Sequence, residues 1–297
     1  MLMAALSGDE QRIIFSKLCN VLDPRAAVAF GSASSELRAL TQAERQQLSA
    51  DFEAATALGW KAGKGSCKEL REAKAVGWHY AGLSFDHLAL LGTLGSVLPA
   101  LEELYLYEAA AGPDGVQRLA EKLGAGALPA VTLLELNGTH VGDAGASALA
   151  TALDRGALPR LERLHLGGTA IGDAGLVALA PALRRLPALE GLGLSRNPLG
   201  DDGLAALVAP PPPAGAPPPA GAPPPATGVL TKLKQLYLGR TDITDAGCAA
   251  LAAALNSGAL PALECLFLMA VPASMAARSA VFAARAGIQS GIGVLHS

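Results

Sequence analysis

The sequence contains few aromatic and few charged residues. Its 297 residues include only 6 Phe, 4 Tyr and 2 Trp, and 16% of the chain is charged whereas 51% is hydrophobic. The apolar content therefore consists mainly of Ala, Leu and Val. This composition excludes a core built around large aromatic side chains and favours helices packed in thin layers.

An excess of one charge is also lacking. The formal net charge is -3, without a long run of either sign, which argues against nucleic acid or an anionic membrane as a partner. The longest weakly polar stretch, residues 88–101, is too short and too interrupted by glycine to span a bilayer. The first residues lack a basic segment and their apolar run stops at Ser7, so no signal peptide is predicted.

Cysteine and histidine are sparse as well. The four cysteines show neither CxxC spacing nor the pattern of a disulfide framework. We interpret them as reduced thiols, which predicts a cytoplasmic or, alternatively, a nuclear location. The five histidines have no metal-ligand spacing with Cys, Asp or Glu. We therefore expect neither a metal nor a cofactor.

What the sequence does contain is an internal repeat. Six segments share the pattern LxxLxxLxL, with Val in place of one Leu in the second, and most follow one another at roughly 30 residues. They begin at Leu98, Leu128, Leu158, Leu186, Leu230 and Leu260. A seventh, worn copy is predicted before them, with Leu70, Ala73 and Ala75 in the places of Leu101, Leu104 and Leu106.

Each repeat has two halves with different periods. The LxL segment alternates as a short strand with one buried face does. The second half, such as LVALAPALRRL from Leu176, spaces apolar residues three and four apart, as in an amphipathic helix. A carboxylate stands before four of these helices, where it can accept hydrogen bonds from the free backbone N–H groups of a helix start. These residues are Asp143, Asp173, Asp201 and Asp245.

The repeats resemble the leucine-rich repeat family, in the long, helix-bearing form of ribonuclease inhibitor-like proteins, whose pattern is LxxLxLxxNxIGDxGxxALAxAL. Only Asn197 meets the Asn position, and Thr139, Thr169 and Thr241 replace it elsewhere; a Thr hydroxyl can still bond the turning backbone. The resemblance implies an α/β fold over residues 67–287: a curved solenoid with parallel strands inside and helices outside. It also implies a non-enzymatic protein that binds another protein.

One longer step between repeats holds PPPPAGAPPPAGAPPP, residues 210–225. Because each proline removes a backbone donor and clashes with the preceding turn, this segment cannot be helical. We predict a loop at 210–228 that leaves the solenoid. It is either a ligand for an SH3- or profilin-like module or a tolerated insertion, and the lack of a nearby Lys or Arg favours the insertion. Residues 288–297 are predicted to be a tail.

Residues 1–66 are predicted to form a small helical module with a break at Asp23-Pro24. Residues 9–40 are similar to an F-box, although the Leu-Pro opening and the late Trp of that family are missing. This resemblance implies a substrate-receptor subunit of a cullin-type ubiquitin ligase, whose adaptor would dock on Ile14, Phe15, Leu22 and Pro24. The alternative is a plain helical cap that shields the open edge of the first repeat.

No motif predicts an enzyme. Residues 63–66 lack the spacing of a phosphate-binding loop, and adjacent carboxylates such as Glu102 and Glu103 point apart along a strand. A weaker alternative comes from the Ran GTPase-activating proteins, which share this type of repeat and act through a loop arginine. Arg196 or Arg240 would fill that role here.

The residues that flank the inward leucines are predicted to face the concave side of the sheet, because side chains alternate along a strand. Four of the scarce aromatic residues lie among them, which favours a binding surface. The small residues of the fourth repeat (Gly191, Gly193 and Ser195) predict a shallow saddle between two aromatic flanks. The predicted partner-binding residues are Glu103, Tyr105, Tyr107, Glu135, Asn137, Arg163, His165, Gln235, Tyr237, Phe267 and Met269.

We predict that shortening residues 210–225 to a brief turn leaves the melting temperature nearly unchanged. The entropy of loop closure changes slowly, by about 0.6 kcal/mol for each doubling of loop length. Thermal unfolding of the shortened chain, followed by circular dichroism, checks this. A large cooperative loss of stability would mean that the segment packs on the solenoid.

Overall fold

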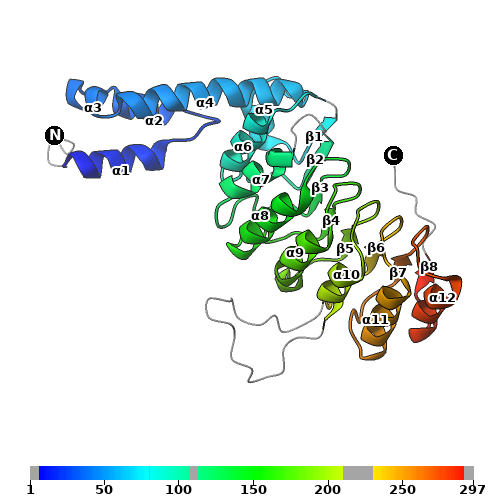
Figure 1. Ribbon diagram of the computed structural model, residues 1–297. Coiled ribbons are helices and arrows are strands. Elements are labelled where there is room, and N and C mark those ends of the chain that lie inside the picture. Colours follow the sequence, from blue (N-terminus) through cyan, green and yellow to red (C-terminus); the bar gives the residue numbers. More distant parts are fainter. Residues whose placement is uncertain (1–6, 80, 108–112, 210–229, 291–297) are drawn as a thin grey trace.

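The computed structural model describes residues 7–79, 81–107, 113–209 and 230–290. It has a curved solenoid with a helical arm at one end (Figure 1). The elements in chain order are α1 Gly8–Leu18, α2 Arg25–Gly31, α3 Ser35–Leu40, α4 Gln42–Lys61, α5 Cys67–Glu72, β1 Ala75–His79, α6 Phe85–Leu94, β2 Glu103–Tyr107, α7 Pro113–Lys122, β3 Leu133–Glu135, α8 Gly142–Asp154, β4 Arg163–His165, α9 Asp173–Arg185, β5 Gly191–Gly193, α10 Asp201–Val208, β6 Gln235–Tyr237, α11 Asp245–Asn256, β7 Cys265–Phe267, α12 Met275–Ala284 and β8 Gln289–Ser290.

Within the described residues, the strands form one parallel sheet in the order β1 to β8. The helices that connect them line the other side of the sheet (Figure 1), and the sheet stays open. This confirms the predicted leucine-rich repeat solenoid with a helical N-terminal module. The proline-rich segment, for which a loop was predicted, lies outside the described residues. The sheet reaches Ser290, so the first residues assigned to a tail pair with β7.

Leucines at equivalent positions form one continuous core between the sheet and the helices. From β2 to β7, each strand points a leucine inward that pairs in register with the leucine of the next strand, and none is more than 1% exposed. These residues are Leu104, Leu134, Leu164, Leu192, Leu236 and Leu266. Because the core runs without a break through all repeats, each repeat depends on its neighbours for burial.

The predicted register of the worn first copy was wrong. β1 pairs with β2 so that Val76 lies opposite Leu104 and Trp78 opposite Leu106, three residues away from the predicted alignment of Ala73 with Leu104. Trp78 is completely buried, and its indole Nε1 donates to the carbonyl oxygen of Leu58 in α4 at 3.1 Å. Trp78 occupies an inward position that leucine occupies in the other repeats. The leucine pattern therefore did not reveal the correct register of this repeat.

The four aspartates predicted to lie before helices form what we call the Asp ladder: each carboxylate accepts hydrogen bonds from the start of the next repeat. The bonds run from Gly172 N to Asp143 Oδ1 (2.7 Å), from Gly200 N to Asp173 Oδ1 (2.7 Å), from Thr244 N to Asp201 Oδ1 (2.8 Å) and from Ser274 N to Asp245 Oδ1 (2.5 Å). The carboxylates therefore accept hydrogen bonds from backbone N–H groups, as expected. These N–H groups belong to the start of the helix in the next repeat, however, and not to the helix that the aspartate itself begins.

The Asp ladder explains the glycine that follows three of these aspartates, Asp173, Asp201 and Asp245, by two residues. Asp173 Oδ1 also accepts from Gly203 N at 2.9 Å, and a Cβ atom at residue 203 would lie 2.7 Å from this oxygen. Any larger residue would push the carboxylate away from the helix start. Aspartate in one repeat and glycine in the next are thus one structural unit.

A second set of hydrogen bonds lies where each strand turns into the loop. Asn197 is buried; its Oδ1 accepts from Thr169 N and Ile171 N, both at 3.0 Å, and its Nδ2 donates to the carbonyl of Leu166 at 2.6 Å. It therefore ties two repeats together. The Thr169 hydroxyl donates to Leu166 O within its own repeat at 2.8 Å. The expected bond from threonine to the turning backbone is confirmed, and the same hydroxyl also lies 3.2 Å from Asn197 Oδ1 in the next repeat.

The N-terminal helices form an arm whose inner part caps the solenoid (Figure 1). Leu22, Ala55 and Leu58 belong to the same core as the repeats, whereas Phe15 and its neighbours form a small separate cluster. The F-box hypothesis needed α1 to present Ile14 and Phe15 outward. Phe15 is 2% exposed and Ile14 is half-buried, so that expectation is wrong for Phe15. Its ring packs in a small cluster with Ala27 of α2 and Leu48 of α4.

We predict that Asp173→Ala destabilises the protein by about 1–3 kcal/mol, because two backbone N–H groups lose their acceptor in a site with little water. Asp202→Ala is the matched control: this neighbouring carboxylate is exposed and makes no hydrogen bond within the described residues. Urea unfolding measures both. Equal effects of the two substitutions would contradict a structural role for the Asp ladder.

Candidate functional site: the concave face

The outward residues of the strands form the concave face, and its most polar part lies on β1 to β4. Tyr105 and Tyr107 of β2 are half-buried, and His79 of β1 is exposed. The His79 and Tyr107 rings stack with centroids 4.7 Å apart and an interplanar angle of 22°, and the Tyr105 and Tyr107 centroids are 6.5 Å apart. We call these three residues the aromatic cluster.

His79 was not among the predicted binding residues. The predicted register of the first repeat was shifted by three residues, so His79 fell outside the predicted strand. The sequence separation between the two strands could have revealed it. His79 precedes its strand partner Tyr107 by the same number of residues as Ala75 precedes Glu103.

Glu135 organises the polar part of this surface. Glu135 is only 9% exposed, although the alternation of side chains along β3 places it on the outward face of the sheet. Asn137 Nδ2 donates to Glu135 Oε1 at 2.6 Å, the Tyr107 hydroxyl also bonds its carboxylate, and His165 Nδ1 lies 3.7 Å from Oε2. Burial raises the pKa of Glu135, but its bonds with His165, Tyr107 and Asn137 outweigh that effect, and the pKa lies below its usual range. The carboxylate therefore stays charged.

A second carboxylate holds the other tyrosine. The Tyr105 hydroxyl donates to Glu103 Oε2 at 2.8 Å, and Arg163 Nη2 lies 3.7 Å from Glu103 Oε1. Burial and then the bond to Glu103 raise the pKa of Tyr105 to about 12, and burial and the bond to Glu135 raise the pKa of Tyr107 further. Both phenols are thus fixed hydrogen-bond donors at neutral pH.

The predicted saddle is narrower than its small residues suggested. Gly191 and Gly193 of β5 are buried, because side chains of β4 lean over them. A Cβ atom on Gly191 would lie 3.3 Å from Arg163 Cγ, and one on Gly193 would lie 3.4 Å from His165 Cδ2. The long side chains of one strand thus fill part of the space left by the glycines of the next.

The far part of the concave face, on β6 and β7, is apolar. Phe267 lies half-buried over Gly239, where it occupies the space of a missing side chain. Tyr237 is half-buried, with its hydroxyl 3.4 Å from Gln235 Oε1, and Met269 is 57% exposed. The predicted residues therefore gather in two groups on one face. β2 and β6 are four strand steps apart, about 19 Å at the usual spacing.

The other predicted residues lie away from this face. Leu22 and Pro24 line a cleft of about 930 Å³ between the α1–α2 loop, α4 and α5. Arg196 and Arg240 are exposed in the loops that follow β5 and β6, in left-handed backbone conformations with φ of 60° and 58°. Neither arginine makes a hydrogen bond through its side chain within the described residues.

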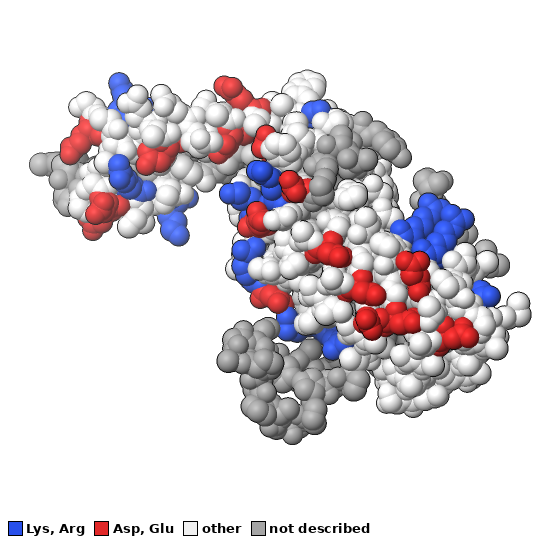
Figure 2. Space-filling model, in the orientation of Figure 1, with Lys and Arg blue, Asp and Glu red and all other residues white. Residues whose placement is uncertain are grey.

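Figure 2 shows basic and acidic side chains mixed along the arm and the left edge of the solenoid, whereas acidic side chains gather over the right part of the solenoid beside a small basic patch. In the described part of the chain, no three His, Cys, Asp or Glu residues are grouped as metal ligands. No helix there has the length and apolar character needed to cross a membrane.

Comparison with known proteins identifies the repeats. Residues 129–150, 158–180, 189–208 and 229–252 match the family described as Leucine Rich repeat. Among solved structures, internalin C2 from Listeria monocytogenes is 17% identical with a TM-score of 0.44, covering 77% of this chain and 78% of its own. Listeria monocytogenes InlP is 16% identical with a TM-score of 0.32, covering 73% of this chain and 65% of its own. No match was found among curated protein sequences.

We predict that Glu135→Gln destabilises the protein by about 1–3 kcal/mol at pH 7, because hydrogen bonds to a buried charge are lost. The pKa of Glu135 is below its ordinary value of 4.5 in the folded state. The charge therefore stabilises the fold above that value, and the stabilisation is lost as pH falls through the lower, folded-state pKa.

The measurement is urea unfolding of the wild type and the variant at pH 7 and again in the acid range. The difference between them should shrink in acid. Glu162→Gln, at an exposed position before β4, is the control and should change little at either pH. A difference for Glu135→Gln that stays constant with pH would contradict the role given to its charge.

Proposed function

We propose that this leucine-rich repeat protein binds another protein on its concave face and has no enzymatic activity of its own. The proposal is supported by two sets of aromatic residues, one on β1 and β2 and one on β6 and β7, which lie on the same face of one continuous sheet. Aromatic residues commonly dominate the energy of interfaces, because they bury much area at little entropic cost. In this sequence they are scarce, yet they gather where the core does not need them.

The observation that carries the proposal is the way in which the aromatic cluster is held. Carboxylates fix the hydroxyls of Tyr105 and Tyr107, and His79 stacks on the second ring. Both tyrosines nevertheless stay partly accessible. Because these side chains are ordered before a partner arrives, binding costs less conformational entropy than it would with mobile side chains.

The spacing of the two groups limits the shape of the partner. A segment that contacts both the aromatic cluster and Phe267 must span about 19–24 Å, from β2 to β6 or β7. A helix needs about 13–16 residues for this length at 1.5 Å per residue. A helix or an extended segment laid across the strands fits this surface.

No observation favours the two other functions over this one. The buried Phe15 removes one of the residues on which a cullin adaptor would dock, and Arg196 and Arg240 have only their exposure to suggest a role in GTPase regulation. We propose a cytoplasmic or nuclear location, which accords with four cysteines that are free of disulfides.

Tyr105→Ala and Phe267→Ala are predicted to reduce partner binding at least tenfold each, because each truncates an anchor of one group. Proteins captured from a cell extract by the wild type are compared with those captured by each variant, and a candidate is then titrated in purified form. Val177→Ala changes an apolar residue on α9 that is 47% exposed, and is the control.

Melting curves must accompany these experiments. Loss of the same captured protein with both variants, at unchanged melting temperature and with normal capture by Val177→Ala, is the expected outcome. Equal capture by all four proteins would contradict binding on the concave face.

A further inference from the structure

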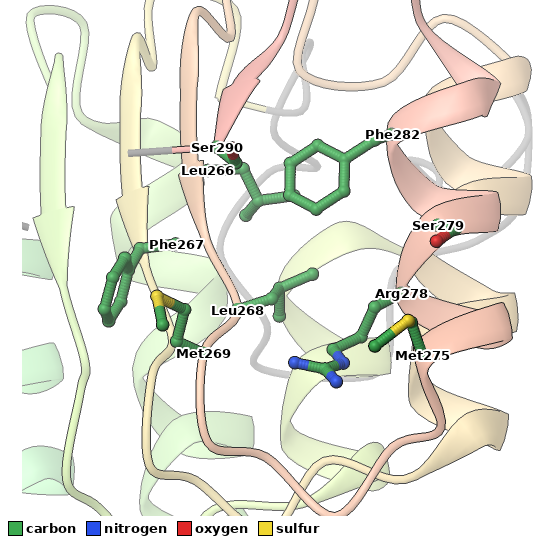
Figure 3. A pocket seen from close by; sticks show the side chains of 9 residues that line it. All are labelled: Leu266, Phe267, Leu268, Met269, Met275, Arg278, Ser279, Phe282 and Ser290. Carbon is green, nitrogen blue, oxygen red and sulfur yellow. The ribbon is translucent and has the colours of Figure 1, made fainter. Parts of the chain in front are cut away.

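Two arginines in the described residues have a buried Nε atom without a hydrogen-bond partner, Arg45 of α4 and Arg278 of α12. Arg278 lies among apolar side chains such as Leu268 and Met275 (Figure 3), and no other basic residue of the described chain lines that pocket. Arg45 instead shares a surface cleft of about 450 Å³ with a second arginine, Arg38 of α3. A buried donor without an acceptor costs free energy, so this cleft is suited to a ligand that supplies an acceptor.

The cleft lies on the arm, away from the concave face (Figure 1), and no acidic side chain of the described residues lines it. Besides the two arginines, its lining residues are Val28 of α2 and Gln42, Gln46 and Ser49 of α4. Neither Arg38 nor Arg45 forms an ion pair anywhere in the described chain. Two positive charges are therefore left without a counter-ion, and an anion would be attracted to both.

Packing, and not strong hydrogen bonding, holds the Arg45 side chain in the cleft. A Cβ atom on Gly31, which is buried in α2, would lie 2.8 Å from Arg45 Cδ, so this glycine leaves the space that the side chain occupies. Arg45 Nη1 lies 3.5 Å from Ser32 Oγ, and Arg45 Nη2 lies 3.4 Å from the carbonyl oxygen of Arg38. Both distances exceed the usual range of about 2.7–3.2 Å. The guanidinium group is therefore positioned, but its hydrogen bonds are weak enough to be replaced by bonds to a ligand.

Arg38 approaches the same place from α3. Its Nη2 lies 3.4 Å from the carbonyl oxygen of Ser32, the residue whose hydroxyl Arg45 approaches. The two guanidinium groups thus meet around the end of α2, where their like charges repel each other. Guanidinium groups are planar and present parallel N–H donors that match the oxygens of phosphate and carboxylate groups. An anion between them would relieve the repulsion and accept hydrogen bonds from both.

We propose that this cleft binds a phosphoryl group on a partner protein, in the form of a phosphoserine or phosphothreonine side chain. Its charge of about −1.5 to −2 at pH 7 balances both arginines, whereas a carboxylate would balance only one. Its three oxygens can accept hydrogen bonds from the two guanidinium groups, including the buried Arg45 Nε. Arginine clusters are a recurring means of recognising phosphorylated segments. Val28, which is 42% exposed at the cleft, adds an apolar surface for a neighbouring residue of that segment and favours the segment over free phosphate.

The test follows the arginine Nε–Hε resonances of the isotope-labelled full chain by nuclear magnetic resonance at constant ionic strength. The probes are inorganic phosphate and the blocked tripeptide leucine–phosphoserine–leucine, together with matched peptides in which glutamate or serine replaces phosphoserine. The phosphopeptide should shift the resonances of Arg38 and Arg45 saturably, and the serine peptide should not. Its affinity should exceed that of the glutamate peptide and that of inorganic phosphate by roughly tenfold, because the former carries less charge and the latter lacks apolar contacts.

Three substitutions locate the binding site. Arg38→Gln removes one guanidinium group from an exposed position and should weaken phosphopeptide binding roughly tenfold. Arg45→Lys keeps the charge but removes the Nε donor, and should weaken binding as well. Arg12→Gln is the control, because it removes an equal charge from an exposed position of α1 that does not line the cleft. Melting curves show whether each variant is folded, and Arg38→Gln decides the test if Arg45→Lys is not.

Four outcomes would overturn the proposal. The phosphopeptide could leave the Nε–Hε resonance of Arg45 unchanged, or Arg38→Gln and Arg12→Gln could weaken binding equally. Equal affinity for the glutamate peptide would assign the cleft to an acidic segment instead. Equal affinity for inorganic phosphate would assign it to the free ion.

Discussion

No repeat of this protein can bury its leucines alone, and the rest of the structure depends on this constraint. A strand of three residues and one helix cover too little surface to form a core, so the next repeat must complete it. The Asp ladder and Asn197 fix how the neighbours meet, since each joins a side chain of one repeat to backbone groups of another. The stacking interactions thus set both stability and curvature.

The same stacking creates the concave face. Parallel register brings equivalent outward residues of successive strands side by side, so residues far apart in sequence, such as Tyr107 and His165, can share Glu135. The polar network on β2 to β4 is largely satisfied within the protein. If the protein functions as proposed, this network positions the aromatic rings. A partner would then contact the ring surfaces, Met269 and the exposed part of Arg163.

The periodic part of the sequence predicted the fold well. The LxL template located β2 to β7 and their outward residues, because leucine spacing directly reflects core burial. The template failed at β1, where Val76 and Trp78 replace the leucines, and the reason is tertiary: Trp78 packs against α4 and donates to Leu58. The direction of Phe15 was missed for a similar reason, since contacts between short helices decide which side of α1 is covered.

Side-chain length explains what alternation alone could not predict about the site. Alternation places Glu135 on the outer face of β3, yet neighbours on both sides bury it. Gly191 and Gly193 offered an open saddle, yet Arg163 and His165 cross the strand boundary and cover them. A concave sheet brings its outward side chains closer together than a flat one does, so long residues reach over short ones in the next repeat. The surface available to a partner is consequently set by pairs of adjacent repeats rather than by single ones.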